Sequence, residues 1–454
     1  MIDPILLIIA VVGLLIVALV WRYDNLGLYL FFSLSFTQCV IEEIGYPPIL
    51  LKAAGASIVV ILLAKAIVFT GRTNRHFRTF GLKMMLFLLA VSVLSALYNA
   101  VPLVAFALYF RVVFIHYLLF TAVLNLDFSE KKVNNLLTFW ILIQIPVILI
   151  KFVIVGVGES YIGTLSLEAG SVSAIFPLAV NCLLLAHYLF KRNPKYLLLA
   201  FGFLLFGIIG AKVSLLFSMP LVLLSVLGFY IITSPKIHLQ VRPVKDLLPL
   251  YPVAVIVLAV ICSLAAVVSI PTLNPEGEVG GSIDISHVKD HVTGYATRYS
   301  SVTQGNVSRY YGLIDTVELM NSSGVRNYLG FGPGDIIESR FLPGNVDALW
   351  YRYGLGYGAR TTLIYAWVQT GMISVIIYWA FQITLARKVY GFYKRSLDPQ
   401  YVILAFGFLG VILVAALDYF AYSKVMFEEA FLAGPYYYIA AVLLKASYRS
   451  SIEV

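Results

Sequence analysis

The chain is a long series of apolar runs, interrupted by a single long polar stretch at residues 271–360. Hydrophobic side chains make up 61% of the residues and charged side chains only 12%. A soluble domain carries about 25% charged residues, so this much apolar surface requires lipid as its solvent. The pattern therefore predicts an all-α polytopic membrane protein.

Thirteen apolar runs are candidates for helices that cross the bilayer, which takes about 20 residues each. The runs are 4–21, 26–41, 49–70, 82–98, 102–125, 134–156, 172–190, 196–210, 213–233, 247–270, 361–385, 400–418 and 431–446. Twelve or fourteen helices remain alternatives, because the second, eighth and ninth runs are short or closely joined. The expected organisation is ten helices in residues 1–270, a partly helical extracytoplasmic loop at 271–360, and three helices with a cytoplasmic C-terminus in 361–454.

Charge in the short loops predicts the orientation. Every second loop is basic: 72–83, 131–132, 191–195, 236–245 and 387–395. Lysine and arginine accumulate on the cytoplasmic side, so we expect the N-terminus and the long loop outside the cytoplasm. The same loops carry most of the net charge of +9, which therefore does not indicate a nucleic-acid partner.

Against this bias, the long loop holds seven cations, listed here together: Lys289, Arg298, Arg309, Arg326, Arg340, Arg352 and Arg360. Cations on the outer side suggest that the loop handles an anion. The alternative is that these arginines pair with the nine acidic residues of the loop, and for Arg326 and Arg340 we favour that alternative.

The middle of the loop has the features of a folded segment. Ser308 is a candidate cap for a helix that runs to about Asn321, and Ser322–Gly324 ends that helix. Residues 330–334 hold three glycines and predict a tight turn with exposed backbone N–H groups.

Two further cations lie in or beside apolar runs. Arg111 is within the fifth run, and Lys212 lies in a turn between the eighth and ninth. A buried charge is costly unless it faces a partner or a cavity. A structural ion pair for Arg111 and a lysine at the membrane surface for Lys212 are the alternatives. Guanidinium groups bind phosphate in a bidentate way, so Lys212, Arg309, Arg360 and Arg111 are our candidates for a diphosphate site.

The order of these features resembles the bacterial O-antigen polymerase and O-antigen ligase superfamily. The matching positions are Arg309, then Gly330 and Gly332, then Gly371 on the following helix, with Lys212 in place of an arginine. The sequence departs from the ligases at two positions: Arg360 stands where they usually carry a histidine, and Gln369 where a glutamate is usual. These departures favour the polymerase branch.

The resemblance implies a multi-pass enzyme of the bacterial inner membrane with its long loop in the periplasm. Its donor and acceptor would be oligosaccharides linked to polyprenyl (undecaprenyl) diphosphate, joined into an O-antigen, capsule or exopolysaccharide. A chain-length regulator protein is an expected partner. The acceptor hydroxyl would attack the anomeric carbon, and the diphosphate would leave. Cations can stabilise that leaving group, and the loop has no Asp-x-Asp motif, so we expect neither a metal nor a cofactor.

Candidates for the remaining roles come from the same loop. The general-base candidates are Asp315, Glu318, Asp335, His287 and His291, of which Asp315 and Glu318 share one side of the predicted helix. The candidates for sugar stacking are Tyr310, Tyr311, Trp350 and Tyr353, although aromatic side chains also anchor proteins at the membrane surface. A ligase and, from another class, a transporter of lipid-linked sugars remain the alternative functions.

Overall fold

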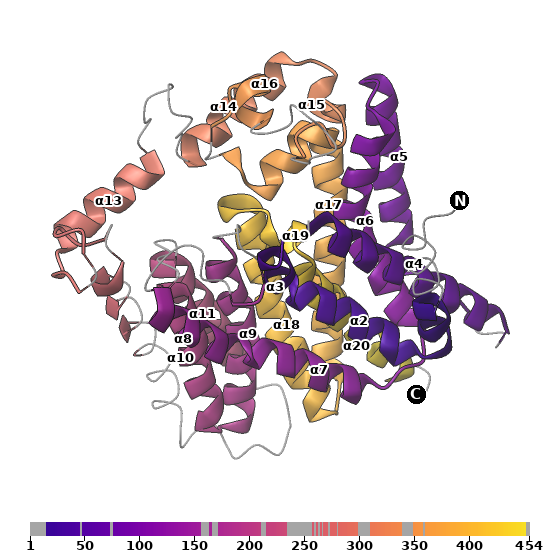
Figure 1. Ribbon diagram of the computed structural model, residues 1–454, viewed down its shortest axis with the longest axis horizontal. Coiled ribbons are helices and arrows are strands. Elements are labelled where there is room, and N and C mark those ends of the chain that lie inside the picture. Colours follow the sequence, from indigo (N-terminus) through magenta and orange to yellow (C-terminus); the bar gives the residue numbers. More distant parts are fainter. Residues whose placement is uncertain are drawn as a thin grey trace.

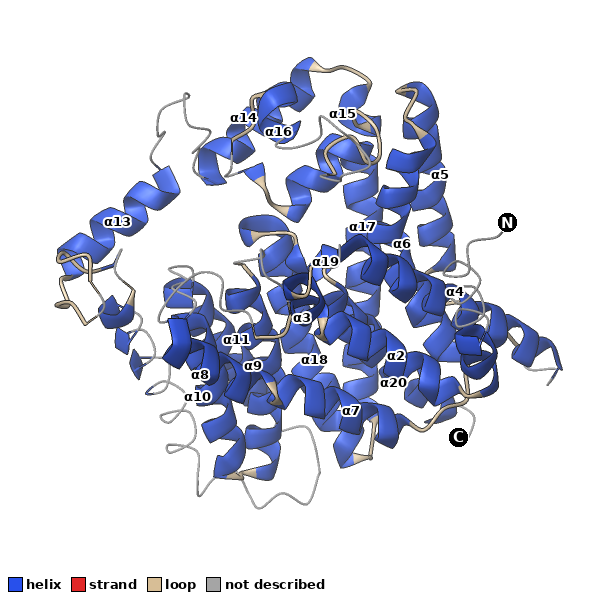
Figure 2. Cartoon of the chain, in the orientation of Figure 1, coloured by secondary structure: helices blue, strands red, loops and turns tan. Residues whose placement is uncertain are grey.

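The computed structural model describes residues 15–45, 48–72, 76–155, 163–165, 171–209, 215–233, 257, 260–261, 264–265, 267–270, 273–278, 280–297, 309–337, 348–356 and 359–450. Within these residues the chain forms helices and no strand (Figure 2). The elements are α2 (Asp24–Phe36), α3 (Gln38–Glu43), α4 (Pro48–Arg72), α5 (Leu82–Tyr98), α6 (Leu103–Asn125), α7 (Glu130–Leu142), α8 (Gln144–Val155), α9 (Val172–Lys191), α10 (Pro194–Ile209), α11 (Leu215–Thr233), α13 (Ile285–Thr297), α14 (Arg309–Ser322), α15 (Arg326–Leu329), α16 (Ala348–Tyr353), α17 (Thr362–Arg395), α18 (Pro399–Leu417), the π-helix η6 (Asp418–Tyr422), α19 (Val425–Glu428) and α20 (Ala430–Ser450).

The helices identify a multi-pass membrane protein. In the described part of the chain, six are long and apolar enough to cross a bilayer: 49–71, 103–125, 130–154, 172–191, 362–395 and 399–422. Three shorter apolar helices, within α5, α10 and α11, accompany them. The all-α membrane class is therefore confirmed, whereas the total of thirteen spans stays a prediction. Two of the thirteen, 4–21 and 247–270, lie largely outside the described residues.

Small residues allow the central helices to pack closely. Helix α9 packs against α10 and α18, and a Cβ atom added at Gly407 of α18 would lie 3.0 Å from the Leu183 side chain. A Cβ at Gly410 would lie 2.9 Å from Cys182. Close approach of backbones at small residues is a main source of helix association in membranes. The rest of the core is aromatic, with Phe120 and Phe381 fully buried.

Two predicted spans are broken helices that share one polar bridge. The run 26–41 divides into α2 and α3 at Thr37, and the run 134–156 divides into α7 and α8 at Ile143. The Thr164 hydroxyl donates to the free carbonyl of Phe36 at 2.5 Å, and the Thr164 carbonyl accepts from the Cys39 N–H at 3.0 Å. The Gln144 side chain accepts from the Thr164 N–H at 2.9 Å. The bridge thus satisfies backbone groups that a break would leave unpaired in lipid.

A third break interrupts α17 at Gly371, which has φ +78°. The carbonyls of Val368 and Gln369, freed by this break, accept hydrogen bonds from the N–H groups of Phe331 and Gly332 at 2.7 and 3.0 Å. The Gln369 side chain accepts from the Gly334 N–H at 2.8 Å. The prediction of exposed N–H groups in this turn was therefore wrong, because they complete the broken helix.

The glycines at this break are required by space. A Cβ at Gly371 would lie 1.9 Å from the Tyr328 carbonyl oxygen, and a Cβ at Gly330 would lie 2.4 Å from the Gln369 backbone. A Cβ at Gly334 would lie 2.1 Å from the Ala105 carbonyl oxygen in the first turn of α6. We call residues 328–334 with the α17 break the glycine junction. It fastens the long loop to α6 and α17.

Helices α14, α15 and α16 lie together at the top of Figure 1, beyond the bundle, and α13 stands to one side. The helix predicted to end near Asn321 is present as α14 and ends at Ser322. Gly324, with φ +59°, follows in the turn that leads to α15. We call this end of the bundle the loop end. The turn between α17 and α18 lies at the opposite end.

Candidate functional site

A short polar segment between α18 and α20 organises the loop end. We call residues 418–429 the connector; it contains η6 and α19. The fully buried carboxylate of Asp418 accepts hydrogen bonds from the Ser423 hydroxyl and, at 2.9 Å, from the Met426 N–H. The Met426 N–H lies in the first turn of α19, where backbone N–H groups have no partner within the helix. Asp418 therefore fixes the shape of the connector.

The beginning of α17 is tied to this connector. The N–H group and the hydroxyl of Thr362 both donate to the Ser423 carbonyl, each at 2.9 Å. Thr361 caps the helix through a bond from the Ile364 N–H. Arg360 directly precedes these two threonines and is partly buried. Its backbone is consequently held beside the connector.

Arg309, the first residue of α14, reaches the same segment from the long loop. Its guanidinium carbon lies 4.9 Å from the centre of the Tyr422 ring. Its charge also acts favourably on the Asp418 carboxylate. The Nη1 atom is buried and has no hydrogen-bond partner among the described residues. An unpaired donor of this kind is costly to bury, and it is available to an anionic ligand.

A second group of charges lies on the bundle side of the connector. Lys424 forms an ion pair with Glu428 at 2.9 Å, and Lys52 of α4 lies 3.8 Å from Glu429. Arg111 of α6 acts on both glutamates, and its buried Nε has no hydrogen-bond partner in the described part of the chain. Arg111 thus acts on these glutamates through its charge, and the structural ion pair considered for it is not among the ion pairs of the described residues.

The two glutamates differ in their tendency to ionise. Burial opposes ionisation of Glu428, but the charges of Lys424 and Lys52 outweigh it and lower the pKa of Glu428 below its usual value. Burial raises the pKa of Glu429, and Lys52 only partly offsets that effect. The ionised Glu428 next to it adds to the increase. The connector thus carries one firmly ionised carboxylate and one that protonates more readily.

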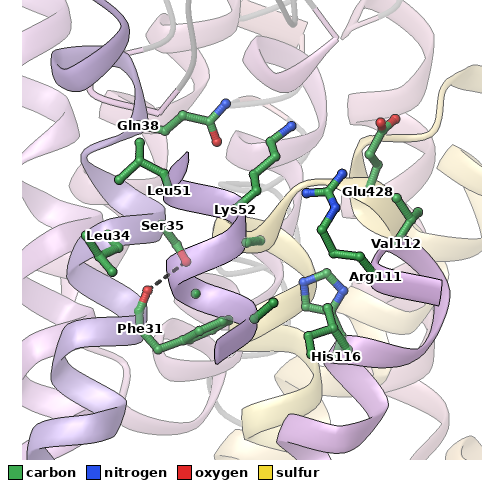
Figure 3. Close-up of a pocket in the computed structure, with 14 residues that line it drawn as sticks. Phe31, Leu34, Ser35, Gln38, Leu51, Lys52, Arg111, Val112, His116 and Glu428 are labelled. Atoms are coloured by element: carbon green, nitrogen blue, oxygen red, sulfur yellow. Dashed lines mark hydrogen bonds between the residues drawn. The ribbon is translucent and has the colours of Figure 1, made fainter. Parts of the chain in front are cut away.

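Lys52, Arg111 and Glu428 border a small cavity of about 40 Å³ between α2, α3, α4, α6 and the connector. Figure 3 shows the ends of the Lys52 and Arg111 side chains near each other, with Glu428 beside Arg111 and His116 below the arginine. A water molecule needs about 10–15 Å³ on this measure, so the cavity holds a few waters. It does not accommodate a diphosphate, which must bind at the outer side of the connector if it binds here.

We refer to the charged residues around the connector as the charged cluster. Its five cations and three carboxylates leave a formal excess of two positive charges; the members are Lys52, Arg111, Arg309, Arg360, Lys424, Asp418, Glu428 and Glu429. They come from α4, α6, α14, the segment before α17 and the connector, which are far apart in the sequence. Partial burial of several like charges is unfavourable unless an anion completes the balance.

Of the four residues predicted to bind diphosphate, Arg111 and Arg309 are placed in the cluster by their side chains, and Arg360 by its backbone beside the connector. The fourth, Lys212, lies outside the described residues. Sequence reasoning missed Lys52, Lys424, Glu428 and Glu429, because each is near the end of an apolar run. One signal was present: Lys424 lies in a loop expected outside the cytoplasm, where the loops 42–48, 99–101 and 157–171 carry no cation.

The predicted general bases do not form one group. Glu318 is exposed on α14, and Asp315 is partly buried on the same helix. Burial raises the pKa of Asp315, and the nearby Glu318 adds to the increase. His287 and His291 lie on α13, with ring centres 6.5 Å apart, at the periphery of the loop end (Figure 1).

Asp335 has a structural role instead. Its carboxylate forms an ion pair with Arg352 and accepts a hydrogen bond from the Tyr353 hydroxyl. The Tyr353 ring, predicted to stack on sugars, packs 4.7 Å from the Phe331 ring within the glycine junction. Both groups are therefore occupied by contacts that hold the loop together.

The other aromatic candidates have mixed positions. Tyr310 is exposed, and its ring centre lies 5.5 Å from that of Tyr311 on α14, next to Arg309. Trp350 belongs to α16, but its side chain lies outside the described part. Tyr310 and Tyr311 stay predicted sugar-stacking residues, and of the two Tyr310 is the exposed one.

Of the two loop arginines expected to pair with acids, Arg326 has other partners. The Nε of Arg326 donates to the Asn99 side chain at 3.2 Å, and its guanidinium lies over the Phe331 ring. Its contacts are structural, but no acidic partner is among the described residues. Arg340 lies outside those residues.

Groups of histidine, cysteine, aspartate or glutamate that could hold a metal ion are absent from the residues that the structure describes. Comparison with known proteins finds no family model and no curated sequence that matches this chain.

Proposed function

We propose that this protein is an integral membrane glycosyltransferase that polymerises oligosaccharide units linked to polyprenyl diphosphate, at the outer face of a bacterial inner membrane. The observation that carries the proposal is the charged cluster on the connector. Arg309 and Arg111 reach it with buried guanidinium nitrogens that have no hydrogen-bond partner among the described residues. A diphosphate at the outer side of the connector would supply the missing acceptor of Arg309.

The chemistry assigned to this site is a displacement at the donor sugar. The acceptor hydroxyl forms a bond to the anomeric carbon, and the bond from that carbon to the diphosphate oxygen breaks. Negative charge develops on the leaving diphosphate, where Arg309 and Arg360 would stabilise it. The proton of the acceptor passes to a base, for which Asp315 is the best placed predicted candidate because it is on the same helix as Arg309 and has a raised pKa.

Arg111 has a different part in this scheme. It lies on the bundle side of the connector, where the cavity is too small for a diphosphate. Its charge, with those of Lys52 and Lys424, would add to the positive potential that the ligand meets. Lys212 remains a predicted diphosphate ligand.

A transporter of lipid-linked sugars is the second candidate, because interrupted helices and intramembrane charges are typical of transporters. In a transporter the broken helix exposes backbone groups to the substrate. Here the freed carbonyls of Val368 and Gln369 are occupied by the glycine junction. This contact favours the enzyme.

A labelled lipid-linked repeat unit incubated with the purified protein in detergent tests the proposal. Growth of a ladder of longer chains is expected, whereas transfer only to a distinct acceptor would identify a ligase. Movement of the label across vesicles without new bonds would identify a transporter.

Variants in the same assay test the site. Arg309→Gln and Arg360→Gln should each lower the rate at least about 100-fold, as loss of a donor to developing charge does elsewhere. Arg309→Lys should also be impaired, since a lysine cannot make the bidentate contact. Arg326→Gln is the matched control, being a loop arginine outside the cluster. Chains of normal length from Arg309→Gln would remove Arg309 from the site.

A further inference from the structure

A groove lies away from the charged cluster, between α11, α17 and α18. Its volume is about 400 Å³, within the range of sites that hold small ligands. Its wall is apolar, with Val226 and Phe229 from α11 and Phe406, Leu409 and Leu413 from α18. These helices cross the bilayer or are apolar enough to lie in it, so the groove is open to lipid rather than to water.

One charged residue, Arg387, lines this groove. It is exposed, and its guanidinium has no ion pair or hydrogen bond among the described residues. Arg387 is eight residues before the end of α17 at Arg395, about 12 Å along the helix axis at 1.5 Å per residue. The apolar run of this helix ends near residue 385, so Arg387 lies where the hydrocarbon meets the headgroups, within reach of a lipid phosphate.

A second cation lies at the same wall. The ammonium of Lys394 lies 4.3 Å from the centre of the Tyr390 ring, and Tyr390 also lines the groove. An apolar channel that ends at two cations has the two parts needed to hold a lipid. The channel accommodates an acyl chain, and the cations meet a negative headgroup. Basic pockets between transmembrane helices bind anionic lipids in this way.

We propose that the groove between α11, α17 and α18 is a binding site for an anionic phospholipid of the surrounding bilayer, with its phosphate on Arg387 and its acyl chain along Phe229, Phe406 and Leu409. The site lies toward the end opposite the loop end, whereas the charged cluster lies at the loop end. It therefore takes structural lipid and does not depend on the proposed transferase activity.

The test uses the full-length protein, purified and delipidated in detergent. Binding of phosphatidylglycerol and of phosphatidylcholine with the same acyl chains is measured by native mass spectrometry. The wild-type protein should bind phosphatidylglycerol at least about fivefold more tightly, the contribution of one cation near an anionic surface. Equal affinity for the two lipids would overturn the proposal.

Two neighbouring cations of α17 supply a matched pair of variants. Arg387→Gln should lose about fivefold in affinity for phosphatidylglycerol and bind the two lipids equally. Lys388→Gln should keep the wild-type preference, because Lys388 carries the same charge but does not line the groove. The same loss in both variants would show that only net charge matters and would contradict the site.

The acyl-chain part is tested separately. Ala386→Phe places a ring in the groove next to Arg387 and should weaken both lipids, while leaving the protein monodisperse. Glycerol phosphate, which has no acyl chain, should not bind. Binding of glycerol phosphate as tightly as phosphatidylglycerol, or binding of a polyprenyl phosphate in preference to phosphatidylglycerol, would overturn the proposal.

Discussion

The glycine junction and the charged cluster lie at the same end of the bundle, but they satisfy their polar groups in opposite ways. In the junction, the backbone donors of residues 331–334 named above and the freed carbonyls of α17 pair with one another. In the cluster, buried nitrogens of Arg309 and Arg111 have no such partner among the described residues. Fully paired groups hold a fold together, whereas charged donors left unpaired are the ones available to a ligand.

This difference changes the meaning of the sequence pattern. The glycine run was expected to present N–H groups, yet its geometry makes it the fastening of the loop. The arginine that precedes it in the pattern, Arg309, is the residue that reaches the cluster. Substitutions in the junction should therefore act on stability, and substitutions in the cluster should act on activity.

The largest expected effect is at the junction. Gly371→Ala places a Cβ 1.9 Å from the Tyr328 carbonyl oxygen, at φ +78°, so both space and backbone conformation oppose it. It should lower the free energy of unfolding by about 3 kcal/mol or more. Thermal unfolding in detergent measures this loss.

Gly324→Ala is the matched control, because Gly324 also has positive φ, at +59°, but has open space around it. Its cost should be about 1 kcal/mol, the conformational contribution alone. Equal losses in the two variants would mean that the close contact with Tyr328 contributes nothing.

The next effect concerns the buried charges. Arg111→Gln leaves Glu428 and Glu429 with less positive charge nearby and should lower stability by less than the roughly 3 kcal/mol of breaking a direct buried ion pair. Adding Glu429→Gln removes one of the uncompensated carboxylates and should restore part of that stability without restoring activity. Urea or thermal unfolding and the polymerisation assay are measured on both variants. A double variant as unstable as the sum of the two single variants would contradict the coupling.

Hydropathy predicted the helices of this chain because a bilayer requires long apolar segments. The run 82–98 and helix α5 have the same bounds, and 102–125 differs from α6 by one residue. The break at Thr37 could not be read. The Phe36 carbonyl that this break frees accepts its hydrogen bond from Thr164, which is more than a hundred residues away in the chain.

The same limit applies to the site. Arg309 stood out because it is a cation in the long loop, and α14 begins at it. Lys52 and Glu429 each lie close to a helix end, where a charge is ordinary. Only the folded chain brings them together, since their ion pair joins residues on α4 and at the start of α20. Periodicity carries no information on such contacts.

A smaller effect should appear in the pH dependence of stability. The folded-state pKa of Glu429 is raised above the usual 4.5, so the folded protein takes up this proton more readily than the unfolded chain. The contribution of Glu429 to stability therefore rises as pH falls through its folded pKa, and it is complete near pH 4.5. The pKa of Glu428 is shifted in the opposite direction, so the contribution of Glu428 to stability is lost only below pH 4.5.

The difference between wild-type protein and Glu429→Gln isolates this contribution. Thermal unfolding of both proteins is measured from pH 7.5 to pH 4.5. As the pH falls, the wild-type protein should gain stability relative to Glu429→Gln. The other titratable groups are the same in both proteins and cancel in the comparison. If the difference in stability stays constant with pH, Glu429 is ionised in the folded protein. Its carboxylate would then be as well paired as the polar groups of the glycine junction.

The smallest effect concerns the ring under Arg309. Its guanidinium lies 4.9 Å from the centre of the Tyr422 ring, a contact worth about 1 kcal/mol when partly buried. Tyr422→Leu should therefore lower polymerisation about fivefold by letting the guanidinium move, while Tyr422→Phe keeps the ring and should retain most activity. If Tyr422→Phe is as slow as Tyr422→Leu, the hydroxyl rather than the ring positions the arginine. If neither variant changes the rate, other contacts hold Arg309 in place. The polar groups of the connector would then be as fully paired as those of the glycine junction.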